Sequence, residues 1–329
     1  MMRLPKMDHA VPSTLIDACS MMGAQGGKAR ILAGGTDLLV ASKLRNVKPS
    51  LLVSLGGIPE LMGIQFDEKE GLRIGAMTPL NEVRYHPNVV KHYPALAEAA
   101  AAVGTTQLQY MGTLGGNLCL DTRCTYYNQS ESWRKSRAIC LKMGGDVCHV
   151  VPKGKKCYAV YSGDMAPALM AHDAQVKLVD SAGERTVNLG DLYTGDGKTP
   201  NHIKPGEILY EVTVPPPAEK QGSTYLKYRV RGSIDFPLAG VAVRVDLKDG
   251  GICHDFRIVL NAVSFGPVIV PEAENLLKGK GLREDLIEQV SEQAIKAAQP
   301  VANTLGATPS YRRKMIGILT RRALMALAN

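Results

Sequence analysis

Residues 31–38 read Ile-Leu-Ala-Gly-Gly-Thr-Asp-Leu, a short apolar run followed by two glycines and the start of a helical segment. This order predicts a buried strand, a tight turn and a helix. Glycines let a backbone approach an anion without a clash from Cβ, and free N–H groups at such a turn can bind phosphate. A Gly-Gly pair is also a common plain turn. The segment lacks the G-x-G-x-x-G pattern of a Rossmann dinucleotide site.

A second segment of the same kind follows further along the chain, where residues 113–117 read Thr-Leu-Gly-Gly-Asn. Two Gly-Gly loops, each with a Thr or Asn side chain, suit the two phosphates of a dinucleotide better than either loop does alone. The sequence contains no Walker lysine motif, HExxH motif or Ser-His-Asp arrangement that would indicate a different chemistry.

The segments around these loops predict an α+β protein in three parts. Residues 1–57 are expected to form a small α/β unit, residues 58–217 a second subdomain, and residues 218–329 an antiparallel sheet covered by helices. The Pro215-Pro216-Pro217 break is a linker signal. Thr78 before Pro79 is a predicted helix N-cap. Strands are predicted at 28–33, 51–55, 72–76, 175–179, 224–230, 239–247 and 252–260, and helices at 12–22, 38–44, 94–103, 283–299 and 310–327.

Five of the seven cysteines fall between Cys119 and Cys157. The N-terminus has no continuous apolar stretch of the kind that a secretory signal needs, so a cytoplasmic protein with reduced or metal-bound thiols is expected. The odd number of cysteines also argues against a full set of disulfides. Crowded thiols in such a chain favour a metal centre.

The charge of the chain is concentrated in the same segment. The whole chain has a net charge of +8, and residues 123–157 carry eight Lys or Arg against two acidic residues, a net charge of +6. The segment has no recognition helix or RNP-like motif, so nucleic acid is not the expected partner. An acidic protein partner and a plain solvated loop both explain the charge. With 45% hydrophobic residues and no apolar run of about 18, the chain can build cores and is not expected to span a membrane.

Taken together, these motifs resemble the FAD-binding medium subunits of the xanthine oxidase family. Residues 31–38 and 113–118 resemble the two pyrophosphate loops of that family, residues 162–169 its FAD-binding aspartate segment, and residues 205–209 its GE(I/L)L element. Residues 225–228 resemble its lysine segment, and 311–313 and 321–324 its terminal helix. The resemblance implies a two-part FAD-binding domain with these cofactor residues: Ile31, Leu32, Ala33, Gly34, Gly35, Thr36, Asp37, Leu38, Thr113, Gly115, Gly116, Asn117, Asp164, Leu209 and Lys227.

The chain departs from that family pattern between the second loop and the aspartate segment. Asn117 and Asp164 are separated by 46 residues, several times the usual spacing, and the excess is a cysteine-rich insert at about 119–160. This insert resembles that of the 4-hydroxybenzoyl-CoA reductases, a branch of the family whose β subunits carry an additional [4Fe–4S] cluster. Aldehyde oxidoreductase subunits of the family also carry such an insert.

A [4Fe–4S] cluster takes four thiolates, and the insert offers five. Cys119 follows the second loop directly and is expected to pack in a core. The predicted ligands are Cys124, Cys140, Cys148 and Cys157, with gaps of 15, 7 and 8 residues that also resemble the reductases. Whether Cys119 replaces Cys124 stays open. Zinc is the rival metal, although structural zinc sites usually use two close C-x₂₋₄-C pairs, and beyond Cys119-x₄-Cys124, at the limit of that spacing, the segment has no second close pair.

The resemblance implies an electron-transfer subunit with no catalytic residues of its own. The partners would be a large subunit with the molybdenum cofactor, where substrate binds, and a small subunit with [2Fe–2S] clusters, in an (αβγ)₂ heterohexamer. For the reductases, electrons would enter from reduced ferredoxin. Two alternatives remain: a FAD subunit of an aldehyde or xanthine oxidoreductase, and a zinc-stabilised binding module without flavin.

Overall fold

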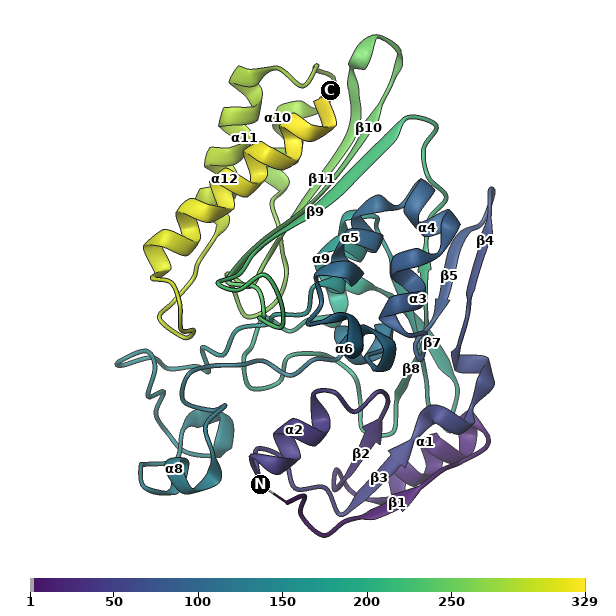
Figure 1. Cartoon of the computed structure of the whole chain (residues 1–329), viewed down its shortest axis with the longest axis vertical. Coiled ribbons are helices and arrows are strands. Elements are labelled where there is room, and N and C mark those ends of the chain that lie inside the picture. The colour runs from purple at the N-terminus through teal and green to yellow at the C-terminus, as the bar shows by residue number, and fades with distance from the viewer. Residues whose placement is uncertain (1–2, 329) are drawn as a thin grey trace.

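The computed structural model describes residues 3–328 and contains three sheets and a separate cysteine-bearing lobe (Figure 1). The first sheet has the order β1-β3-β2 with both pairs parallel. Parallel neighbours need a crossover connection, and the two helices of this part supply it. The elements are β1 (Asp8–Ala10), α1 (Leu15–Ala24), β2 (Ala29–Leu32), α2 (Leu38–Lys43) and β3 (Leu51–Ser54).

The second sheet is antiparallel in the order β4-β5-β8-β6-β7, and a group of short helices packs against it (Figure 1). Fully buried Leu72, Leu96 and Leu169 belong to the core between these layers. The strands are β4 (Ile64–Asp67), β5 (Gly71–Gly75), β6 (Gln175–Val179), β7 (Glu184–Asn188) and β8 (Ile208–Val214). The helices are α3 (Leu80–Tyr85), α4 (Pro87–His92), α5 (Pro94–Ala102), α6 (Thr106–Met111), α7 (Leu114–Leu118) and α9 (Met165–Ala171), while α8 (Glu131–Lys135) lies in the lobe.

The third sheet is antiparallel in the order β12-β11-β10-β9, and α11 and α12 cover one of its faces (Figure 1). Val243 and Ile258 of the sheet share a core with Ile316 of the last helix. This is the helix-covered antiparallel sheet expected from the sequence. Its elements are β9 (Gln221–Tyr228), β10 (Ala239–Leu247), β11 (Cys253–Asn261), β12 (Val268–Ile269), α10 (Pro271–Leu277), α11 (Glu284–Ala297) and α12 (Pro309–Ala328).

One local expectation was wrong. Thr78 does not cap a helix: its hydroxyl accepts from the Gly63 N–H at 3.0 Å, and Pro79 is the residue before α3. The second glycine loop forms the short helix α7, because the Thr113 hydroxyl accepts from the Gly116 N–H at 3.1 Å and caps its start. The domain limits at residues 57 and 217 stay a prediction. Within residues 3–328, no helix is both long and apolar enough to cross a bilayer.

Arg312 fixes the last helix to the rest of its domain. Its side chain is fully buried in α12 and donates to the Leu238 carbonyl at 2.8 Å and to the Val301 carbonyl at 2.9 Å. It also donates to the Ala262 carbonyl and to Asn303 Oδ1. Burial lowers the pKa of this guanidinium to about 10. Two of these acceptors, the Leu238 and Ala262 carbonyls, belong to buried residues.

Replacing Arg312 by leucine should therefore destabilise the protein by about 3 kcal/mol or more, since buried carbonyls would lose their donor. Urea unfolding followed by circular dichroism measures this. The matched control is Arg322→Leu, at an exposed position of the same helix, which should change stability by less than about 0.5 kcal/mol. Equal stabilities of the two variants would contradict the assigned role of Arg312.

Candidate functional site

The two glycine loops, far apart in sequence, touch one another. A Cβ on Gly34 would lie 1.6 Å from the Met111 carbonyl oxygen and 3.1 Å from Gly112 Cα, so only glycine fits at that contact. Gly35 has φ +70°, the left-handed region that glycine adopts without strain. The structure therefore places residues 33–37 directly against the chain that leads into the second loop.

The two loops differ in their free donors. Within residues 3–328, the N–H groups of residues 34–37 make no hydrogen bond, so the first loop offers unpaired donors to an anion. In the second loop, Leu114 N–H donates to Thr78 O at 3.0 Å, and Gly115 N–H donates to Ala76 O at 2.8 Å. The first loop is therefore the better phosphate-binding site, and the second loop supports the position of the first.

The Asn117 side chain joins the second loop to the aspartate segment. Its Oδ1 accepts from the Met165 N–H at 3.0 Å, at the start of α9. A Cβ on Gly163 would lie 2.7 Å from the Asn117 carbonyl oxygen, so the two segments are in close backbone contact. Asp164, the residue between these contacts, is thereby positioned next to the loops.

Asp164 and Lys227 form a buried ion pair, with Nζ 2.8 Å from Oδ2 and each side chain only 4% exposed. Tyr225 donates its hydroxyl to the other carboxylate oxygen at 2.6 Å, and Lys227 also donates to the Ala102 carbonyl at 2.8 Å. Burial raises the pKa of the Asp164 carboxyl, and Lys227 opposes that shift. Burial also lowers the pKa of Lys227. Two predicted cofactor residues from segments far apart in the sequence thus contact each other.

The remaining predicted cofactor residues lie on the elements that surround these contacts. Ile31 and Leu32 are on β2, and Ala33 follows it. Thr36, Asp37 and Leu38 lead into α2. Leu209 is buried on β8 in the same core as Leu114 and Tyr225. Just before β8, Glu207 of the GE(I/L)L element accepts two hydrogen bonds from Arg185 at 2.7 and 2.8 Å and holds the turn before Leu209, a pairing that the sequence did not indicate.

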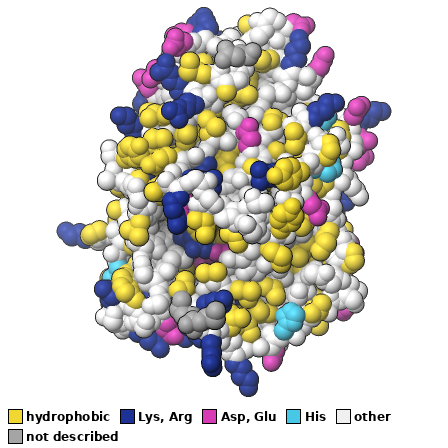
Figure 2. Space-filling view, in the orientation of Figure 1, with side chains coloured by type: hydrophobic (Ala, Val, Ile, Leu, Met, Phe, Trp, Pro, Cys, Tyr) yellow, Lys and Arg dark blue, Asp and Glu magenta, His cyan; other side chains and the backbone are white. Residues whose placement is uncertain are grey.

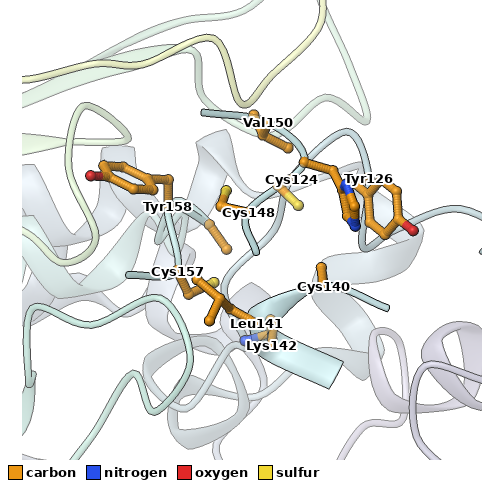
Figure 3. Close-up of a pocket in the computed structure, with 11 residues that line it drawn as sticks. Cys124, Tyr126, Cys140, Leu141, Lys142, Cys148, Val150, Cys157 and Tyr158 are labelled. Carbon is orange, nitrogen blue, oxygen red and sulfur yellow. The ribbon is translucent and has the colours of Figure 1, made fainter. Parts of the chain in front are cut away.

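The cysteine lobe leaves the main body and rejoins it at adjacent residues. Arg123 and Val160 form an antiparallel bridge with two hydrogen bonds of 2.8 Å. Between them, Cys124, Cys140, Cys148 and Cys157 come from four separate stretches of the chain and line one pocket (Figure 3). Tyr126, Leu141 and Tyr158 supply apolar walls to the same pocket. All four predicted ligands are therefore brought together.

The other three cysteines lie elsewhere. Cys119 packs beside the core of the second subdomain, and burial raises its pKa to about 12. Cys19 and Cys253 are buried in other cores. Burial also raises the pKa of Cys124, to about 11, so iron would have to displace the thiol proton there. Among residues 3–328, no three His, Cys, Asp or Glu side chains converge on a point that could hold one metal ion.

Three anchors fix the lobe to the main body. Arg134 is 3% exposed and donates to the carbonyls of Leu44 and Arg45 at 3.2 and 3.0 Å. Lys142, whose side chain is 6% exposed, donates to the Gly197 carbonyl at 2.7 Å and to Asp121 at 2.8 Å. Thr125 N–H donates to the Asn303 carbonyl at 3.0 Å. These anchors contact all three of the sheet-bearing parts.

Arg123 links the lobe to the first glycine loop, a contact that the sequence did not indicate. Its guanidinium forms an ion pair with Asp37 and lies 4.1 Å from the centre of the Phe236 ring. Burial lowers the pKa of Arg123 to about 10. Because Cys124 is the next residue, one predicted cluster ligand adjoins a residue that touches the predicted phosphate loop.

The α+β fold and its converging glycine loops are typical of a protein that binds a phosphate-bearing cofactor. The family described as FAD binding domain in molybdopterin dehydrogenase matches residues 5–217, and the CO dehydrogenase flavoprotein C-terminal domain matches residues 224–327. The chain therefore belongs to the FAD-binding medium subunits of the xanthine oxidase and CO dehydrogenase family, and it is a subunit of an oxidoreductase. The predicted fold class, family and FAD binding are confirmed.

Individual relatives span nearly the whole chain. The aldehyde oxidoreductase FAD-binding subunit PaoB of Escherichia coli (strain K12) is 32% identical over 311 residues, covering 91% of this chain and 90% of that protein. The carbon monoxide dehydrogenase medium chain of Hydrogenophaga pseudoflava is 29% identical and covers 98% and 97%. A solved carbon monoxide dehydrogenase from the same organism superposes with a TM-score of 0.82 at 28% identity, covering 99% and 98%.

Proposed function

We propose that this chain is the FAD and [4Fe–4S] subunit of a molybdenum enzyme, and that the enzyme is a 4-hydroxybenzoyl-CoA reductase. One observation supports the presence of the cluster. Whereas the other cysteines lie elsewhere, four cysteines line a single pocket: Cys124, Cys140, Cys148 and Cys157. Four soft thiolates suit an iron–sulfur cluster. A cubane is larger than one ion, so its ligands need not converge on a single point.

The residues of the flavin site fit FAD. The unpaired N–H groups of residues 34–37 would hold a phosphate, and Thr36 and Asn117 lie on the two loops beside it. Asp164, Leu209 and Lys227 would line the rest of the site. Bound FAD would supply the exchange between one-electron and two-electron transfer. The partners would be a molybdenum-containing large subunit and a [2Fe–2S] small subunit in an (αβγ)₂ assembly, with the substrate site on the large subunit.

The visible spectrum of the purified protein, together with iron and zinc analysis, tests the cofactor assignment. We expect flavin bands, a broad iron–sulfur absorption and about four iron atoms in this chain. Zinc in place of iron would reject the cluster. Membership of the FAD-binding family already argues against the alternative of a flavin-free zinc module.

A second candidate is the FAD subunit of an aldehyde oxidoreductase, favoured by the 32% identity to PaoB. Substrate assays on the complete complex separate the two. Reduction of 4-hydroxybenzoyl-CoA by reduced ferredoxin supports the first candidate. Oxidation of aldehydes without activity on the thioester supports the second.

The proposed reductase takes electrons from reduced ferredoxin, and the lobe carries the charge to bind an acidic donor. Lys135, Lys153, Lys155 and Lys156 are exposed on it. Reversing the charge at Lys135, Lys153 and Lys155 together should lower the rate of reduction by ferredoxin at least about tenfold at low salt and flatten its dependence on salt. Stopped-flow measurements at several ionic strengths give both quantities. Lys69→Glu, at an exposed turn of the second subdomain, is the control and should leave the rate unchanged.

A further inference from the structure

We infer that an acidic, small redox protein docks on the outer wall of the cysteine lobe, with Ile139, Met143 and Val147 at the centre of the contact. We call these three side chains the docking patch. Their exposed fractions are 57%, 38% and 48%. The inference rests on the proposed function, because it assumes that the pocket behind the patch holds an electron-carrying cluster.

The local backbone explains why these apolar side chains face outward. Cys140 and Val147 form a parallel bridge, and the Leu141 N–H donates to the Val147 carbonyl at 2.9 Å. Successive residues of an extended segment point to opposite sides. Since Cys140 and Cys148 line the pocket, their neighbours Ile139 and Val147 point away from it.

The turn between these two segments brings the patch together. Gly144, with φ +94°, reverses the chain after Met143, and the Gly145 N–H donates to the Cys140 carbonyl at 3.0 Å. A Cβ on Gly145 would lie 2.2 Å from the Ile139 carbonyl oxygen, so the chain at Gly145 passes directly beside Ile139. A partner bound to the docking patch would therefore be separated from the pocket only by the backbone that carries Cys140 and Cys148.

The positive charge of the lobe favours an acidic partner. Arg137, Lys153 and Lys155 are exposed on the same lobe, and Figure 2 shows Lys and Arg side chains beside hydrophobic ones over this lower-left part of the molecule. Residues 123–157 contain two acidic side chains. Glu131 is paired with Lys48 and Lys135, and Asp146 is exposed within the turn. A positive surface attracts an acidic partner and raises its rate of association.

The size of the patch fits a transient partner better than a permanent subunit. Redox encounters bury little area, whereas permanent interfaces are larger and more apolar. Three apolar side chains on a lobe with several exposed cations offer a small contact centre of this kind. Placed beside the pocket, that centre would bring the donor close to the cluster, and electron transfer becomes faster as the distance shortens.

The test uses the complete complex with Ile139→Ser and Val147→Ser combined, and separately with Met143→Ser. The probe is a reduced acidic bacterial ferredoxin, and dithionite serves as a small reductant that needs no docking. We expect the second-order rate constant for reduction by ferredoxin to fall at least about tenfold, with unchanged iron content, FAD content and rate with dithionite. Val90→Ser, an exposed apolar position on α4, should change none of these.

Three outcomes would overturn the inference. An unchanged rate constant with ferredoxin in both patch variants would show that the patch is not the docking site, while the cluster assignment would stand. Dissociation of the subunits in the variants would make the patch a subunit interface instead. A wild-type complex without iron in this chain would remove the proposed function and the inference together, and the metal analysis identifies that case before any kinetic measurement.

Discussion

Replacing Cys140 by serine should remove about four iron atoms per chain and abolish the broad iron–sulfur absorption, while most of the FAD stays bound. Cys140 is buried in the pocket wall, and it also bridges to Val147 through its backbone. Serine keeps the size of the side chain and the backbone contacts, so the change removes mainly the thiolate. Iron analysis and the visible spectrum of the purified complex measure the effect, and electron transfer from ferredoxin should fall with the iron.

The matched control for this experiment is Cys119→Ala. Cys119 lies in the same stretch of sequence but packs beside the core near Tyr161 and does not line the pocket. This variant should keep its full iron content and lose at most about 1–2 kcal/mol of stability. Retention of iron in the Cys140 variant, or its loss in the Cys119 variant, would show that the ligand set is wrong.

Replacing Lys227 by methionine should destabilise the protein by about 3–5 kcal/mol and lower its FAD content. The change leaves the Asp164 carboxylate buried beside Tyr225 without its cation. Asp164 would then take up a proton more readily in the folded state than in the unfolded state. Because the folded pKa would lie above the unfolded value near 4, the destabilisation should grow as the pH rises above about 4. Urea unfolding at several pH values and the ratio of flavin to protein measure these effects.

Two further variants make this result interpretable. Combining Lys227→Met with Asp164→Asn removes both charges and should recover a large part of the lost stability, since no buried charge remains unpaired. Lys220→Met breaks an exposed ion pair with Asp249 just before β9 and should cost less than about 1 kcal/mol. If the double variant were no more stable than Lys227→Met alone, the ion pair would not be the cause.

The sequence predicted the elements whose pattern is local. Apolar and polar residues alternate along 239–247, which predicted a strand of that length, and the structure gives β10 these same limits. The four thiols at 124, 140, 148 and 157 were singled out because a [4Fe–4S] cluster takes four thiolates, Cys119 was expected to pack in a core, and their spacing resembles that of the reductases; in the structure they line one pocket. The second glycine loop became the helix α7 because the side chain of Thr113 supplies a cap, a detail that the two glycines concealed.

What the sequence did not reveal depends on contacts between distant segments. Arg123 has no neighbour in sequence that marks it, yet it reaches Asp37 across the fold. The pairing of Glu207 with Arg185 and the burial of Arg134 against the loop at residues 44–45 arise in the same way. Such contacts follow from the packing of sheets and lobe, and no periodicity records them.

The Arg123–Val160 bridge has a consequence for the ancestry of this subunit. Cα atoms across an antiparallel bridge lie about 5 Å apart, so a short link could join the two positions directly and leave the host scaffold undisturbed. The acceptors that receive Arg134 and Lys142 in the host are main-chain carbonyls, which every sequence provides. Apart from the ion pairs of Arg123 with Asp37 and of Glu131 with Lys48, the lobe is attached through this bridge and through main-chain acceptors, which makes it largely modular. Evolution could therefore add or delete the electron-entry device as a unit without redesigning the flavin module beneath it.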